Sequence, residues 1–177
     1  EKNNGKIPVV HSDYDRMMAM RAQLFRDPKI KEILTGATTE LSIVTSTRKC
    51  RIDIATSGKP EIWDYKTSTT AHPEKFGLKA HDLGYWIKMA WQADIFKEAY
   101  GIEPCSVGFI VQDKNTPYIP QCYKMTKEQL SVGLDQAILA EKLLTSCLES
   151  GKFPAYGGGV QELHTPGFIG KRYGIDG

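Results

Sequence analysis

The sequence predicts an α/β fold in which helices flank a central mixed β-sheet that contains an antiparallel meander of three strands. Three short β-like runs, at residues 40–46, 51–56 and 61–67, follow one another without an intervening helix. Helical patterns stand before these runs, after them and again at the end, with one more pair of strands between the last two. This order does not alternate strictly, which argues against a Rossmann or barrel fold.

The first helix is predicted over about residues 13–35, because Ser12 and Asp15 resemble a capping box and apolar residues follow at helical spacing. Pro28 is the place where this helix would break. The Ser-Gly-Lys-Pro turn at residues 57–60 separates the second and third strands of the meander.

A loop rich in Thr, Pro and Gly is expected over residues 68–80, followed by a long helix over 81–100 that stops near Gly101. Two further strands are predicted over 105–111 and 118–125.

The last helix is predicted to begin at a second capping box, formed by Thr126 and Gln129, and to end near Gly151. Its buried face is expected to carry five apolar residues, Leu130, Leu134, Ile138, Leu144 and Leu148.

The length and composition are those of one ordinary globular domain over residues 1–177, with a loose lead-in over 1–12 and an irregular tail over 152–177. The net charge is only +2, and no apolar run approaches the ~18 residues that cross a membrane. The four cysteines have no C-x-x-C spacing, which argues against a zinc cluster and favours reduced thiols in a cytoplasmic protein.

Two acids and a lysine converge on one face of the predicted meander. Asp64 and Lys66 are two residues apart in the third strand, and Asp53 lies on the neighbouring strand around the turn. Such charges are costly to bury unpaired, and a divalent cation that prefers oxygen ligands, Mg²⁺ or Mn²⁺, relieves the repulsion. The arrangement therefore predicts a metal-dependent centre that hydrolyses a phosphodiester.

The alternative for Asp64 and Lys66 is a surface salt bridge, because Asp-x-Lys tripeptides are common. Asp53 across the turn and a further acid at Glu40 favour the active site. Arg51 shares the face of Asp53, where it would contact a phosphate or form an ion pair with Glu40 or Asp64.

A longer series surrounds these residues: Glu40-Leu41-Ser42, Arg51-Ile52-Asp53, Trp63-Asp64-Tyr65-Lys66-Thr67 and Gln92. The series resembles the RecE-type exonucleases of phages and prophages, within the PD-(D/E)xK nuclease superfamily, and more distantly phage lambda exonuclease. The resemblance covers about residues 13–150 and implies a restriction-endonuclease-like core.

The resemblance implies roles for these residues. Asp53, Asp64 and the main-chain carbonyl of Tyr65 would bind the metal, and Lys66 would position or activate the water. Glu40 would support a second metal or its waters, with an ordinary strand carboxylate as the alternative.

Gln92 would touch the site or the DNA backbone. Lys88 would share its helix face and meet a phosphate, with plain solvation as the alternative. Thr67 and Ser68 would bind a phosphate or simply end the strand. One departure is Phe96, where relatives often carry Tyr one turn after the glutamine.

As a whole, the resemblance implies a Mg²⁺-dependent exonuclease that digests the 5′ strand at ends of double-stranded DNA and leaves 3′ overhangs for a RecT-type annealing protein. A homo-oligomeric ring, trimer or tetramer, in the cytoplasm of a bacterial or phage-infected cell is expected, and encirclement would hold a chain of low net charge on DNA. The alternatives are a structure-specific or restriction-type endonuclease and an inactive nuclease fold that only binds DNA.

Overall fold

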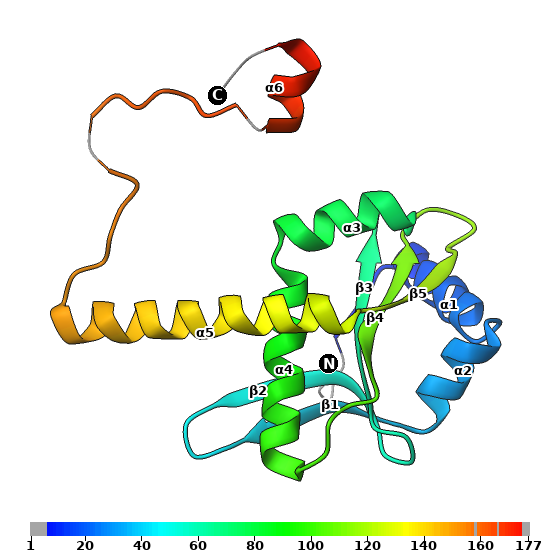
Figure 1. The fold of residues 1–177 in the computed structure, drawn as a ribbon. Coiled ribbons are helices and arrows are strands. Elements are labelled where there is room, and N and C mark those ends of the chain that lie inside the picture. The colour runs from blue at the N-terminus through cyan, green and yellow to red at the C-terminus, as the bar shows by residue number, and fades with distance from the viewer. Residues whose placement is uncertain (1–6, 158, 166, 175–177) are drawn as a thin grey trace. The chain divides into compact units, whose positions relative to one another are not determined.

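The computed structural model describes residues 7–157, 159–165 and 167–174, and Figure 1 shows a five-stranded sheet with helices on both of its faces. In chain order the elements are α1 (His11–Leu24), α2 (Pro28–Thr35), β1 (Ala37–Val44), β2 (Lys49–Thr56), β3 (Glu61–Ser68), α3 (Pro73–Asp82), α4 (Tyr85–Tyr100), β4 (Ser106–Asp113), β5 (Pro120–Lys124), α5 (Lys127–Ser150) and α6 (Gly167–Tyr173).

The chain divides into two compact units, Glu1–Glu141 and Lys142–Gly177. The first unit holds the sheet, the helices α1 to α4 and the beginning of α5, and it carries every predicted site residue. The second unit holds the end of α5 and the short helix α6. Within the described residues, no helix is both long and apolar enough to cross a membrane.

The sheet is mixed, with the strands in the spatial order β1-β2-β3-β4-β5. β1, β2 and β3 form the predicted antiparallel meander, β3 and β4 run parallel, and β5 returns antiparallel to β4. Because parallel neighbours need a crossover connection, the chain passes through α3 and α4 between β3 and β4. The predicted fold class is therefore correct.

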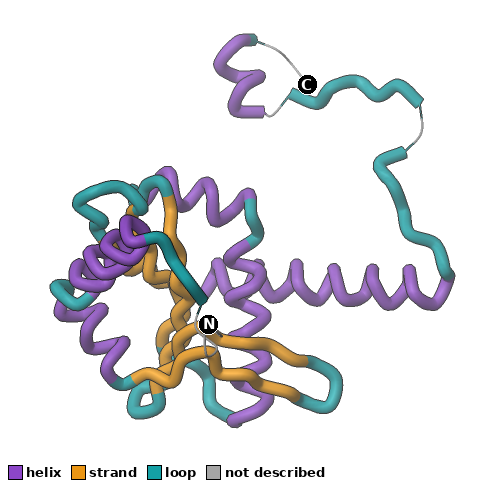
Figure 2. Tube along the Cα trace, turned by 180° about the vertical axis from the view of Figure 1, so that it is seen from behind, coloured by secondary structure: helices purple, strands orange, loops and turns teal. Residues whose placement is uncertain are grey.

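Each face of the sheet has its own apolar core. The face covered by α3, α4 and the start of α5 packs Ile62, Phe76, Met89 and Val107, among others. The opposite face, covered by α2 and the end of α1, packs Ile30, Ile33, Ile54, Trp63 and Ile110. Figure 2 shows this second helical layer from behind.

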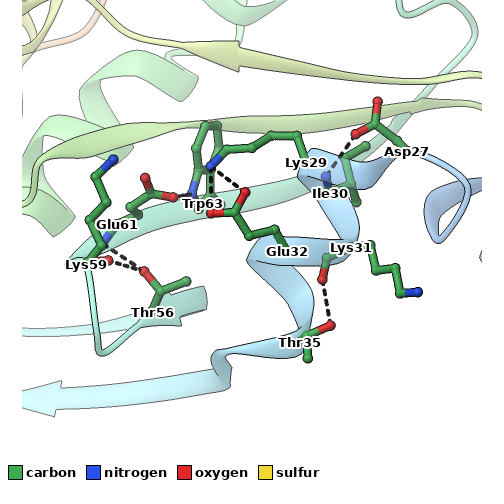
Figure 3. Close-up of polar contacts among 10 residues, drawn as sticks. All are labelled: Asp27, Lys29, Ile30, Lys31, Glu32, Thr35, Thr56, Lys59, Glu61 and Trp63. Carbon is green, nitrogen blue, oxygen red and sulfur yellow. Dashed lines mark hydrogen bonds and ion pairs between the residues drawn. The ribbon is translucent and has the colours of Figure 1, made fainter.

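The position of Trp63 shows which face of the sheet each residue of β3 occupies. Its indole nitrogen donates a 3.0 Å hydrogen bond to the buried carboxylate of Glu61, on the α2 side of the sheet (Figure 3). Since side chains alternate along a strand, Ile62 and Asp64 must point to the opposite face, toward α3 and α4. Trp63 is thus part of the core on the α2 side.

The first predicted helix is two helices, and the break falls at Pro28 as expected. Asp27 caps α2 by accepting a hydrogen bond from the Ile30 amide at 2.9 Å (Figure 3). The predicted capping box at Ser12 is wrong. α1 begins at His11, two residues before the predicted start at residue 13, and its N-cap residue, Val10, makes no side-chain hydrogen bond. Residues 1–6 of the predicted lead-in lie outside the described residues, and the remainder of it is partly helical.

The predicted loop over residues 68–80 is wrong in its second half, where the chain forms α3. Pro73 at the first helical position supplies a helix start that the Thr- and Gly-rich composition concealed. A left-handed Gly84 then separates α3 from α4, so the predicted helix over 81–100 begins at Tyr85 and ends at the left-handed Gly101.

The capping box of α5 is confirmed, since the Thr126 hydroxyl accepts from the Gln129 amide at 3.2 Å and the Gln129 side chain accepts from the Thr126 amide at 2.9 Å. The predicted buried face is wrong at Ile138, Leu144 and Leu148, which are exposed. Gly133 is buried instead, because a Cβ there would lie 3.0 Å from the Trp86 carbonyl oxygen on α4.

Candidate active site

Asp53 and Asp64 occupy facing positions on β2 and β3. The two strands pair from Thr56–Glu61 to Ile54–Trp63, and the next position in the same register would bring Asp53 opposite Asp64. The paired ladder stops there, and the Tyr65 amide donates to the Asp53 carboxylate at 3.3 Å. The meander therefore places both predicted acids side by side, on the face toward α4.

Lys66 and Lys88 both reach Asp64, whose side chain is 1% exposed. Lys66 forms an ion pair with Oδ2 of Asp64, and its ammonium lies 5.2 Å from the centre of the Tyr85 ring. Lys88 arrives from α4, and its Nζ is 2.5 Å from Oδ1. The prediction that Lys88 and Gln92 share one helix face is confirmed, because both reach the meander strands from α4, as does Tyr85.

Electrostatics tie these groups together. Burial raises the pKa of Asp53, and the charge of Asp64 and a hydrogen bond with it raise the pKa further, against the lowering effects of Lys88 and Lys66. Burial alone would lower the pKa of Lys88, but its hydrogen bond and attraction to Asp64, with Asp53 and Glu40, raise it overall. The acids thus repel each other, and the lysines offset that repulsion.

Glu40 lies at the β1 position opposite Asp53, in the one place where the β1–β2 ladder is interrupted. Its backbone φ of 55° is left-handed, which is uncommon for a residue other than glycine and occurs often at functional sites. Its carboxylate is exposed and forms an ion pair with Arg51 at 2.8 Å. The ion-pair alternative for Arg51 is therefore confirmed in this structure.

Gln92 supports β2 from α4. Its side chain is 3% exposed, and its amide donates to the main-chain carbonyl of Arg51 at 2.7 Å. This bond fixes the strand two residues before Asp53. Gln92 therefore binds the strand that carries Asp53, and it is not a solvent-exposed helix residue.

The hairpin turn between β1 and β2 is also anchored to α4. Arg48 donates to Asp94 at 2.7 Å and to Glu98 at 2.9 Å, and its guanidinium lies 4.9 Å from the centre of the Trp91 ring. Hydrogen bonds and charges of the two acids raise the pKa of Arg48 against the effect of its burial. This cluster, which the sequence did not single out, holds the hairpin next to the helix that carries Lys88 (Figure 2).

A family described as a PDDEXK-like domain of unknown function (DUF3799) matches residues 1–166. The chain belongs to this family. Comparison with curated proteins finds no match by sequence.

A crystal structure from Eubacterium rectale named "Putative exonuclease" is similar to this PDDEXK-like chain, with a TM-score of 0.66 and 12% sequence identity. The match covers 92% of this chain and 66% of that structure, so the chain spans slightly less than two thirds of it. The likeness shows a shared fold. Together with the family description, it supports a nuclease, a hydrolase of phosphodiesters.

The donor set of the PDDEXK-like centre fits a divalent cation. Oδ2 of Asp64 is a buried oxygen that, among the described residues, has no hydrogen-bond partner of acceptable geometry, although the Lys66 ammonium contacts it as an ion pair. A second carboxylate, Asp53, stands beside it. No group of three or more His, Cys, Asp and Glu side chains converges within the described part of the chain. A metal here would therefore have two carboxylates and a main-chain oxygen such as that of Tyr65.

The remaining predicted residues lie along β3. Thr67 is exposed, and Ser68 is 2% exposed with its hydroxyl 3.5 Å from the Lys79 Nζ of α3. The Tyr65 hydroxyl donates to Gln112 at 2.6 Å on the α2 side, so only its backbone faces the acids. Lys79 was not predicted, because the helix that carries it was taken for a loop.

Phe96, where the sequence departs from the family pattern, is a core residue. The centre of the Phe96 ring lies 4.7 Å from that of Tyr100. His11 lies at the exposed start of α1 beside Asp15. A groove of about 860 Å³ between α4, α5 and the start of β4 has none of the predicted site residues in its lining.

Proposed function

We propose that this chain is a Mg²⁺-dependent nuclease that hydrolyses the phosphodiester bonds of linear double-stranded DNA from its ends. The observation that carries the proposal is the facing pair Asp53 and Asp64, with the Lys66 ammonium on a buried oxygen of Asp64. Family membership supports the nuclease part of this proposal.

Each residue of the centre has a chemical task in this proposal. Asp53, Asp64 and the Tyr65 carbonyl would hold the metal, which would polarise the phosphoryl oxygen and acidify a water. Lys66, 22% exposed, donates its hydrogen bonds to the attacking water or to the charge that develops on the phosphate. Glu40 and Arg51 lie at the open edge of the site, where Arg51 can exchange its carboxylate partner for a phosphate.

The RecE-type resemblance supports the finer parts of the proposal. These are digestion of the 5′ strand, a 3′ overhang delivered to a RecT-type annealing partner, a ring of three or four copies, and a cytoplasmic location. The net charge of +2 is in keeping with retention on DNA by encirclement, because few counterions would be released by the surface alone. Ser68, which alternation places on the same face as Asp64 and Lys66, is proposed as a further phosphate contact, whereas Thr67 falls on the α2 face of β3.

Digestion of end-labelled linear duplex tests the proposal, with 5′-phosphate and 5′-hydroxyl ends compared in Mg²⁺ and in EDTA. We expect the linear duplex to shorten from its 5′ ends in Mg²⁺ only, and a covalently closed circle to stay intact. Cutting of the circle would instead identify an endonuclease.

Variants connect the activity to these residues. Lys66→Ala and Asp64→Ala should lose about 10²–10⁴-fold in rate. Lys97→Ala is the matched control and should keep full activity. It removes an exposed lysine of α4 that, in the described part of the chain, forms an ion pair with Glu103. Unchanged activity of pure Lys66→Ala would show that another centre does the chemistry.

A further inference from the structure

We propose that Lys88 is a resident counter-cation of the carboxylate pair, which a divalent metal displaces from Asp64 and which then binds a substrate phosphate. The inference rests on the proposed metal-dependent nuclease function. It adds a residue that couples metal binding to DNA binding, outside the Asp-Asp-Lys series of β2 and β3.

Both oxygens of Asp64 are occupied by ammonium groups in this structure. Lys88 Nζ is 2.5 Å from Oδ1, and Lys66 contacts Oδ2. The carboxylate is 1% exposed and both of its oxygens contact an ammonium, so a metal that Asp64 ligates would compete with these lysines. Metal binding at Asp64 would therefore displace at least one ammonium.

Lys88 is the lysine that can leave. Its side chain is 43% exposed, whereas that of Lys66 is 22% exposed and is held against the Tyr85 ring. Lys66 also belongs to the same strand as Asp64, while Lys88 reaches the site on a flexible four-carbon stem from α4. A rotation about that stem carries the charge from Asp64 toward solvent, where DNA must approach.

The charge balance of the site favours this exchange. Glu40 and Arg51 neutralise each other, and Asp53 and Asp64 are matched by the two lysines. A divalent cation would add two charges to a neutral group. Release of Lys88 reduces the excess at the acids from two positive charges to one and leaves a free ammonium beside them. That ammonium attracts the phosphate of the substrate strand, so metal and DNA each favour the binding of the other.

Calorimetry with Mn²⁺ tests the exchange without any measurement of cleavage. Lys88→Met keeps the apolar stem and removes the charge, and it should bind Mn²⁺ about tenfold tighter than the unchanged protein, a difference of ~1.4 kcal/mol. Lys97→Met, nine residues further along the same helix, should leave the affinity unchanged. Lys88→Arg should restore competition with the metal.

The effect on DNA should have the opposite sign. With Mn²⁺ present and a duplex whose ends carry phosphorothioate linkages, Lys88→Met should bind DNA more weakly, and the slope of log affinity against log salt should fall by about one. Tighter metal binding together with weaker DNA binding is a pattern that simple damage to the fold would not produce.

Lysine acetylation of the unchanged protein gives a test that needs no variant. Mass spectrometry should find Lys88 labelled faster with Mn²⁺ than with EDTA, while Lys97 labels equally in both. Equal or slower labelling of Lys88 with Mn²⁺, or Mn²⁺ binding by Lys88→Met that is no tighter than that of the unchanged protein, overturns the inference. If the unchanged protein binds no Mn²⁺ at all, the proposed function itself fails, and the two failures remain distinct.

Discussion

Gln92 on α4 donates its side-chain amide to the main-chain carbonyl of Arg51 on β2, at 2.7 Å, inside the layer that packs helix against sheet. The bond lies beside the apolar core residues that pack α4 on the sheet. The Gln92–Arg51 bond fixes the position of β2 relative to α4, and hence the distance between Asp53 and Lys88. A glutamine that the sequence associates with DNA is thus, in this structure, a positioning residue.

The first prediction concerns this link. Gln92→Leu should destabilise the protein by ~1–3 kcal/mol, because the Arg51 carbonyl loses a buried donor. In nuclease assays kcat should fall while KM for DNA changes little, since the displaced group is Asp53. Urea denaturation measures the first effect. Gln121→Leu, an exposed glutamine of β5, is the matched control. A rise in KM alone, with full stability, would mean that Gln92 touches DNA instead.

The meander and its acids were predictable because both depend on local pattern. The Ser-Gly-Lys-Pro turn and the alternation of Ile52, Asp53 and Ile54 determine which side chains share a face. The buried face of α5 was mispredicted, because the helix turns its small Gly133 toward α4 and leaves Ile138, Leu144 and Leu148 exposed. Periodicity identifies an amphipathic helix, but close helix contact can select small residues over large ones.

The partners of the acids were not predictable in the same way. Lys88 and Asp64 are separated by 24 residues, and only the crossover through α3 and α4 brings them together. The left-handed backbone of Glu40 likewise leaves no mark in the sequence, because glutamate is not a residue type that favours it. Long-range ion pairs and local strain depend on the assembled fold. They place Arg51 on Glu40, which was one of its predicted alternatives, and Lys88 on Asp64, which neither of its predicted alternatives included.

A second prediction follows from the repulsion between the acids. Asp53→Asn should raise the melting temperature at neutral pH in EDTA, because it removes the half-buried one of two neighbouring like charges, and should abolish stabilisation by Mn²⁺. Asp135→Asn, at an exposed position of α5, should do neither. A variant that is less stable than the unchanged protein in EDTA would contradict the repulsion.

The pH dependence of that gain has a definite sign. Because the folded pKa of Asp53 is raised, the folded state keeps the proton that the unfolded state releases. The stability from this proton is complete below the ordinary carboxyl pKa of ~3.9 and is lost as pH rises through the folded value. The melting-temperature advantage of Asp53→Asn should therefore be absent in acid and grow toward neutral pH.

A third prediction concerns the contact of β4 with β5. A Cβ on Gly108 would lie 2.1 Å from the Tyr123 carbonyl oxygen and 2.9 Å from a ring carbon of Trp63. Gly108→Ala should therefore cost ~1–3 kcal/mol or more, since the backbone of β5 must move. Gly58→Ala is the matched control, because a Cβ in that turn meets nothing within 4 Å among the described residues. Equal melting temperatures for the two variants would contradict this packing.

The last prediction concerns Cys122 on β5, where burial, with the charge of Asp27 as a smaller cause, raises the thiol pKa to about 11. Iodoacetamide reacts with thiolate, so at pH 8 it should modify the exposed Cys105 of the folded protein well before Cys122. A raised folded pKa also contributes stability that is complete below the ordinary thiol pKa and is lost as pH rises through about 11.

Mass spectrometry of labelled peptides, with time and with pH from 8 to 11, measures the rate at which Cys122 reacts and how that rate depends on pH. In urea the two cysteines should react alike, which separates pKa and burial from any difference in the peptides themselves. Cys105→Ser should leave the rate at Cys122 unchanged, because that rate is set by the surroundings on β5. Labelling of Cys122 as fast as Cys105 at pH 8 would show that the edge strand opens more readily than its packing against α2 and β4 allows.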